Sequence, residues 1–274
     1  MNSEKVKIFI GSGEQSLLER KVLIYSLRKH TKRELDIQVF NGSHNAIESE
    51  ELEPRLAPLS LALKYRNLTE FSLYRYLIPE LCDFQGRAIY LDSDMVCLAD
   101  IGQLFSTALE GCDFLAKRDD SHPGAAKPWG LSAMLIDCEG CRFPLEQIFR
   151  EIDEGLYTYS EFSHMGQRFL AHHPYQPGEL DPQWNVYDRC DSQTKLIHYT
   201  ELFTQPWKYP DHPYGEIWFS YLREAQAAGA VTDRDIDLTI RRGFARADLQ
   251  AGNSPGFSGR VKRKLSKVLA RNSR

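Results

Sequence analysis

The chain has 274 residues, of which 42% are hydrophobic and 26% are charged. This composition is typical of a folded globular protein and excludes a globally disordered chain. No run approaches the roughly 18 apolar residues that a membrane-spanning helix needs, and the charged N-terminus lacks the apolar core of a signal peptide. These features predict a cytoplasmic protein.

The formal net charge of −4 hides an uneven distribution. Seven basic residues and no acid follow Pro255, which leaves 27 basic and 38 acidic residues in the rest of the chain. An acidic body argues against nucleic-acid binding. Apolar side chains recur at helical spacing within the basic segment 260–271, which predicts an amphipathic helix in peripheral contact with the anionic inner face of a membrane. A disordered tail and an ordinary packed helix are the alternatives.

The N-terminal part of the chain predicts a β-α-β unit. Residues 5–10 are expected to form a strand that Gly11-Ser12-Gly13 ends, residues 17–30 a helix, and residues 36–40 a second strand. A β-α-β opening implies a parallel sheet. The polar segment 41–56 is expected to be a loop.

Strands and helices continue to alternate along the rest of the chain. We expect strands at 87–91, 112–116, 131–137 and 195–199, helices at 69–81, 145–154 and 217–229, a shorter helix from Asp235, and irregular structure over 155–190. This pattern predicts an α/β fold with a mostly parallel central sheet flanked by helices. We expect one domain over residues 1–252, followed by a linker and the basic tail over 253–274.

The strongest local signal is the segment Ile89-Tyr90-Leu91-Asp92-Ser93-Asp94. Ligands collect at the carboxyl ends of strands in open α/β sheets, and this apolar strand ends in two carboxylates one residue apart. A hard divalent cation removes their mutual repulsion and offers open positions to phosphate oxygens. Asp233 and Asp235 have the same spacing but follow no apolar strand, so they predict the acidic first turn of a helix.

Two other functions are considered, a phosphotransferase nucleophile at the Asp-x-Asp segment and a zinc site at two cysteines. A strand followed by Asp-x-Asp-x-Val also fits the nucleophile loop of haloacid-dehalogenase-type phosphotransferases, in which the first Asp attacks phosphorus. That fold normally opens with this strand, whereas a complete β-α-β unit precedes it here. Cys138 and Cys141 have metal-like spacing, but no second pair accompanies them, so we expect buried thiols rather than a zinc site.

Three motifs resemble glycosyltransferase family 8, which includes bacterial lipopolysaccharide glucosyl- and galactosyltransferases and glycogenin. They are TEFSLYRYLIPE at 69–80, IYLDSDMV at 89–96 and DIGQLF at 100–105, and a looser likeness extends from Lys7 to about Trp207. The resemblance implies a GT-A fold and a retaining hexosyltransferase that uses a nucleotide sugar, usually a UDP-sugar, with Mn²⁺ or Mg²⁺. The implied acceptor is a glycan or a lipid-linked sugar, as in lipopolysaccharide or polysaccharide biosynthesis.

The resemblance also implies the site residues. Asp92, Asp94 and His198 match the metal ligands. Arg75 matches the arginine that reaches the donor sugar or phosphate, and Gln167 echoes an Asp-Gln pair near the reacting carbon, so both are catalytic candidates. The expected nucleotide contacts are Gly11, Ser12, Gly13, Glu14, Arg75, Ser93 and Lys208.

Two positions depart from the family motif around His198. Glu201 stands where the family has Gly, and Gln205 stands where it has the Lys that precedes Pro-Trp. That Lys normally neutralises the leaving diphosphate, and Lys208 is the candidate to replace it. These departures keep open a degenerate relative that binds sugars without turnover.

Overall fold

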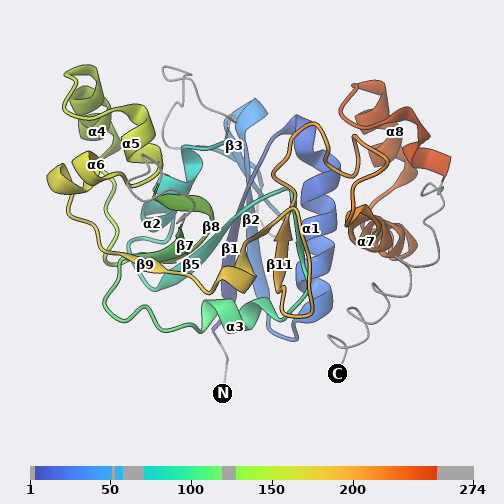
Figure 1. Ribbon diagram of the computed structural model, residues 1–274, viewed down its shortest axis with the longest axis horizontal. Helices are drawn as coiled ribbons and strands as arrows, with labels where there is room; N and C mark the ends of the chain where they lie inside the picture. The colour runs from blue at the N-terminus through green and yellow to red at the C-terminus, as the bar shows by residue number, and fades with distance from the viewer. Residues whose placement is uncertain (1–3, 51–52, 58–70, 119–127, 252–274) are drawn as a thin grey trace. The chain divides into compact units, whose positions relative to one another are not determined.

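The computed structural model describes residues 4–50, 53–57, 71–118 and 128–251 (Figure 1). The chain forms two compact units. The first falls within Met1–Gly13, Arg33–Asp92 and Gly102–Pro182, and the second within Glu14–Lys32, Ser93–Ile101 and Gln183–Arg274. The amphipathic helix expected at 260–271 lies outside the described residues, and the division at 252 stays a prediction.

The first unit is built on an eight-stranded sheet with the order β4-β3-β2-β1-β5-β8-β7-β9. Its strands are β1 (Val6–Ser12), β2 (Leu35–Asn41), β3 (Ala46–Ser49), β4 (Arg55–Leu56), β5 (Arg87–Asp92), β7 (Phe114–Arg118), β8 (Trp129–Asp137) and β9 (Pro177–Glu179). The α/β class and the parallel β1–β2 pair are as predicted.

The sheet is mixed rather than mostly parallel. The pairs β1–β2, β1–β5 and β7–β9 are parallel, and the pairs β2–β3, β3–β4, β5–β8 and β7–β8 are antiparallel. The prediction of a loop over 41–56 is wrong for its described residues, because β3 and β4 lie there. Strands of four and two residues are too short for their alternation to be read from the sequence.

The helices of the first unit are short. They are the 3-10 helices η2 (Gly42–His44) and η3 (Tyr74–Leu77), and the α-helices α2 (Ile78–Leu81), α4 (Leu145–Asp153), α5 (Tyr159–Ser163) and α6 (Gln167–His172). The single helix expected over 69–81 is replaced by η3 and α2 in its described part, because Pro79 has no N–H with which to continue the preceding turn. The expectation of irregular structure over 155–190 misses α5 and α6.

Aromatic side chains fill the core of the first unit. Phe9 and Phe40 stack at 5.4 Å between ring centroids, and Phe40 stacks on Tyr74 at 5.3 Å. Phe162 of α5 and Phe169 of α6 are both fully buried in the same hydrophobic cluster. Figure 1 shows α4, α5 and α6 gathered as one group of helices.

The second unit contains a three-stranded sheet with the order β10-β11-β6. Its elements are β6 (Met95–Cys97), β10 (Val186–Tyr187), β11 (Leu196–His198), α1 (Leu17–His30), α7 (Gly215–Ala227), α8 (Asp233–Arg241), η1 (Glu14–Ser16) and η5 (Ala247–Ala251). Two further short elements, α3 (Ile101–Phe105) and η4 (Pro182–Trp184), each continue from one unit into the other.

The helix α1 has the bounds predicted from its apolar spacing, and it packs against α7 and α8 (Figure 1). Buried side chains of α1, β6, β11, α7 and α8 form one hydrophobic core around Trp207 and Trp218. Asp233 and Asp235 lie in the first turn of α8, where Asp235 forms a capping box with Thr232, as expected for a helix start. Within the described ranges, no helix is long and apolar enough to span a bilayer.

Candidate metal and nucleotide site

The turn between β5 and β6 carries the two predicted carboxylates. β5 ends at Asp92 and β6 begins at Met95, so Ser93 and Asp94 form the connection. Tyr90 lies on the same face of β5 as Asp92, and its hydroxyl donates a hydrogen bond of 2.6 Å to Asp92 Oδ1. The carboxylates therefore lie at the end of a buried strand, and Tyr90 fixes the first of them.

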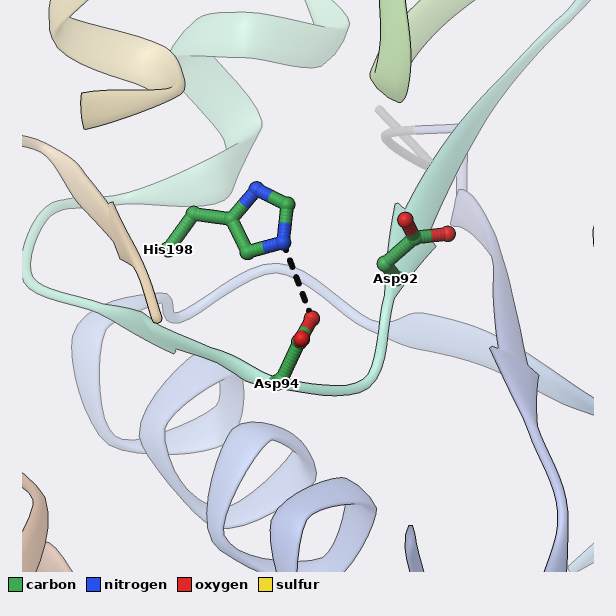
Figure 2. Close-up of side chains that lie close together, drawn as sticks. All are labelled: Asp92, Asp94 and His198. Atoms are coloured by element: carbon green, nitrogen blue, oxygen red, sulfur yellow. Dashed lines mark ion pairs between the residues drawn. The ribbon is translucent and has the colours of Figure 1, made fainter. Parts of the chain in front are cut away.

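Asp94 and His198 meet within the second unit because β11 pairs antiparallel with β6. His198 Nε2 lies 3.0 Å from Asp94 Oδ1 (Figure 2). The other ring nitrogen, Nδ1, lies 3.1 Å from Asn185 Oδ1, and both His198 and Asn185 are buried. An amide oxygen only accepts, so Nδ1 carries a proton and donates it to Asn185.

This tautomer gives His198 the chemistry of a metal ligand. In the neutral ring, the lone pair of Nε2 faces a carboxylate oxygen, and two acceptors at 3.0 Å repel each other unless a proton or a cation lies between them. Histidines that bind metals commonly donate their second N–H to an oxygen in this way, which fixes the ring. Asn185 therefore fixes the ring of His198 with Nε2 toward Asp94.

Asp92, Asp94 and His198 can each offer one ligand atom, and these atoms lie within 4.8 Å of one another (Figure 2). Asp94 lies only two residues after Asp92, so the closeness of the carboxylates follows from the chain itself. Two carboxylate oxygens and one imidazole nitrogen suit a divalent ion such as Mn²⁺. No other group of three potential ligands occurs among the described residues, and Cys138 and Cys141 are buried thiols.

Arg75 of η3 is buried against Asp92. Its Nη2 lies 3.5 Å from Asp92 Oδ1, and its guanidinium lies 4.5 Å from the centroid of the Tyr90 ring. Nε donates to Ser72 O at 2.9 Å, and Nη1 donates to Leu131 O. Burial opposes the charge, but Tyr90 and Asp92 outweigh it and raise the pKa of Arg75. Arg75 is thus a counter-charge to Asp92.

The turn at residues 11–14, which is predicted to contact the nucleotide, also makes contacts within the protein. A Cβ atom at Gly11 would collide with the Tyr90 hydroxyl and with the ring of Phe71, so this glycine gives Tyr90 the space to reach Asp92. Ser12 and Gly13 are buried, and the carboxylate of Glu14 forms an ion pair with Arg242. A nucleotide role for these four positions stays a prediction.

The two positions that depart from the family motif differ in exposure. Glu201 is exposed, whereas Gln205 is 3% exposed and donates from Nε2 to Asp94 Oδ2 at 3.1 Å. Lys208 is exposed, and its Nζ donates to Gln205 Oε1 at 2.7 Å and to Leu202 O at 3.2 Å. Lys208 is therefore linked to Asp94 through the side chain of Gln205.

Glu19 of α1 adds a buried acid to the same unit. It is 4% exposed, and its Oε2 has no hydrogen-bond partner in the described part of the chain. Burial raises the pKa of Glu19 to about 8, with Lys208 opposing the shift and Asp94 adding to it. Glu19 is therefore largely protonated at neutral pH.

The remaining predicted residues are Ser93, which is buried in the turn, and Gln167, which begins α6 with an exposed side chain. A catalytic role for Gln167 stays a prediction. Sequence reasoning assigned no role to Tyr90, Glu19 or Asn185. Tyr90 could have been found from strand alternation, and Glu19 from its place in the apolar stripe of α1, but only the fold brings Asn185 to His198.

Residues 7–135, a little under half of the chain, match the family model described as Glycosyl transferase family 8. Protein CDI of Arabidopsis thaliana is 26% identical over 179 residues, which are 57% of this chain and 65% of that protein. The match thus spans slightly less than two thirds of this relative's own length. The predicted resemblance to family 8 is confirmed.

Three solved structures share the fold. The WbbM bifunctional glycosyltransferase has a TM-score of 0.56 at 14% identity, over 87% of this chain and 52% of that chain. GlyE of Streptococcus pneumoniae TIGR4 has 0.55 at 16%, over 88% and 65%. The galactosyltransferase LgtC, solved with donor and acceptor sugar analogs, has 0.57 at 12%, over 82% and 100%. These matches confirm the GT-A fold and leave the haloacid-dehalogenase alternative without support.

Proposed function

Because residues 7–135 match the family model described as Glycosyl transferase family 8, we propose that this chain transfers a hexose from a nucleotide sugar, with a UDP-sugar as the expected donor. The proposed acceptor is a glycan or a lipid-linked sugar, and the anomeric configuration is retained. One observation carries the metal-dependent part of the proposal. His198 presents Nε2 to Asp94 at 3.0 Å while Asn185 holds the other ring nitrogen.

In the proposed mechanism, Asp92, Asp94 and His198 hold a divalent cation, Mn²⁺ or Mg²⁺. When bound, that ion supplies a Lewis acid for the departing diphosphate. Tyr90 fixes the carboxylate of Asp92 through its hydroxyl. Lys208 presents an exposed ammonium beside the ligands and neutralises leaving-group charge, which is the main electrostatic demand of the reaction.

Gln167 and Arg75 are proposed to act near the reacting carbon and the donor. Gln167, exposed at the start of α6, is proposed to lie near the reacting carbon, and Arg75 is proposed to act on the donor through the charge that it places beside Asp92. We favour front-face attack by the acceptor hydroxyl over a covalent intermediate, because no carboxylate pair with clear glycosidase placement can be picked from the sequence.

A thermal-shift screen of nucleotide sugars, with and without Mn²⁺, tests this function. A ligand that binds the native state at 100 times its Kd adds about 2.7 kcal/mol of stability, and we expect a UDP-sugar to do so only with Mn²⁺. Hydrolysis or transfer of that sugar then separates an enzyme from a degenerate relative, which Glu201 and Gln205 keep as the second candidate. Stabilisation that is equal with and without Mn²⁺ would contradict metal dependence.

We also propose that the basic tail brings the enzyme to an anionic membrane, where a lipid-linked acceptor resides. Each basic residue near such a surface contributes about 1 kcal/mol, and the short apolar strip makes the binding weak and salt-sensitive. Full-length protein should therefore co-sediment with anionic liposomes and not with neutral ones. Equal sedimentation of a chain truncated after Pro255 would remove the membrane role.

A further inference from the structure

Gln205 connects two charged groups of the second unit. Its amide nitrogen donates to Asp94 Oδ2 at 3.1 Å and to the Tyr199 carbonyl oxygen at 2.9 Å, so both of its N–H bonds are used. Its amide oxygen accepts from Lys208 Nζ at 2.7 Å. The buried side chain is therefore held at both ends.

The charges on either side fix the orientation of this amide. The reverse orientation would place the amide oxygen against the carboxylate of Asp94 and the N–H groups against the ammonium of Lys208. Both contacts would be repulsive. The amide therefore has one favourable orientation, and the polarity of the contacts is set by Asp94 and Lys208 themselves.

This arrangement restrains both carboxylate oxygens of Asp94. Oδ1 faces His198 Nε2 at 3.0 Å, and Oδ2 accepts from Gln205 at 3.1 Å. Rotation of the carboxylate would break the hydrogen bond from Gln205 and turn Oδ1 away from His198. Backbone pairing adds to the restraint, because Tyr199 N donates to Asp94 O at 3.0 Å.

We propose that Gln205 is a positioning residue that orients Asp94 for the divalent cation and anchors Lys208 beside it for the diphosphate. The proposal rests on the proposed function and names a residue pair that carries out the work of the single lysine expected before Pro206. A neutral amide has an advantage over a lysine in this place. It donates to Asp94 without cancelling the negative charge that attracts the cation.

The orientation of Asp94 by Gln205 is tested by Mn²⁺ binding to the purified, nucleotide-free protein. The electron paramagnetic resonance signal of unbound Mn²⁺ measures this binding. Gln205→Met keeps the volume and removes the amide, and it should weaken Mn²⁺ binding about tenfold or more, as is typical when a partner of a metal ligand is lost. The exposed Gln193 of the same unit provides the matched control, Gln193→Met, which should bind like wild type.

The anchoring of Lys208 by Gln205 is tested by UDP binding at saturating Mn²⁺. Lys208→Met should leave Mn²⁺ affinity unchanged or higher, and it should weaken UDP binding about tenfold. Because Gln205 anchors Lys208, the double variant Gln205→Met/Lys208→Met should lose less UDP affinity than the product of the fold-losses in the two single variants. Independent losses would overturn the anchoring role.

A buried methionine at this position can impair folding, so Gln205→Lys serves as a second variant. It keeps a donor for Asp94 but adds a charge that competes with the cation, and it too should bind Mn²⁺ more weakly. Wild-type Mn²⁺ affinity in whichever of the two variants folds would overturn the positioning role alone. Absence of Mn²⁺ binding by the wild-type protein would instead overturn the metal-dependent function, and the positioning role with it.

Discussion

Asp92 and Asp94 are two residues apart, but their surroundings differ in charge. Asp92 accepts from Tyr90 and lies 3.5 Å from the buried guanidinium of Arg75, so part of its charge is already balanced. Asp94 contacts the imidazole of His198 and the neutral amide of Gln205. One carboxylate is thus compensated by the protein, and the other keeps its charge available, which makes Asp94 the stronger attraction for a cation.

The largest expected effect is on transfer itself. Asp94→Asn should lower the transfer rate roughly 1000-fold with the fold intact, because it removes the less compensated carboxylate of the pair. Asp92→Asn should also lower the transfer rate strongly, while retaining more Mn²⁺ affinity than Asp94→Asn. Steady-state rates and Mn²⁺ titration measure both effects. Asp233→Asn, in the other Asp-x-Asp, is the control, and wild-type activity in both site variants would reject the assignment.

Loss of Arg75, the buried counter-charge to Asp92, should lower the stability of the protein. Arg75→Ala removes the buried guanidinium beside Asp92 and its hydrogen bonds to Ser72 O and Leu131 O, so we expect a loss of about 3 kcal/mol in the free energy of unfolding. Urea denaturation measures it. Arg223→Ala, which removes an exposed ion pair with Glu216, should cost less than about 1 kcal/mol. Equal costs would mean that Arg75 does not compensate Asp92.

The second unit, which contains Asp94, also contains the buried acid Glu19, and this acid should make the stability of the protein depend on pH. Its folded-state pKa of about 8 lies above the ordinary 4.5, so the folded chain holds a proton that the unfolded chain has released. The contribution of Glu19 to the free energy of unfolding is therefore fully present below the ordinary pKa and is lost as pH rises through about 8. Between pH 6 and 8, wild type should lose about 2 kcal/mol more than Glu19→Gln. Parallel pH profiles in urea denaturation would show that Glu19 is ionised throughout.

The smallest of these effects concerns Lys208. Lys208→Ala should lower turnover about tenfold, because it removes one electrostatic donor to the leaving group. The exposed Lys29 of α1, which pairs with Glu224, supplies the control variant Lys29→Ala. A rate that matches this control would identify Lys208 as an ordinary surface lysine.

The sequence predicted the elements with strong, long patterns. The helix α1 has fourteen residues with an apolar stripe, and its bounds agree with the prediction. The strand β5 was clear because an apolar run ends in two acids. In contrast, β3, α5 and α6 have four to six residues, and so few positions do not establish a period. Their packing in the first unit, rather than local propensity, determines them.

The site was predictable to the extent that it is local. Asp92 and Asp94 follow from one strand and its end, whereas His198 was assigned only through the family resemblance. The roles of Asn185 and Gln205 depend on side-chain contacts across 13 and 111 positions of sequence. Neither residue type in its own segment indicates such a partner, so these contacts could come only from the fold.

The order of segments in the two units has a consequence for synthesis of the chain. The polypeptide passes from one unit to the other five times, and the core of the second unit joins α1 to α7 and α8 near the opposite end of the described residues. A ribosome releases Asp94 about a hundred codons before Gln205. The proposed cation ligands Asp94 and His198 therefore come together late in translation, after long-range contacts have formed, and nascent chains arrested before α7 should be protease-sensitive in α1.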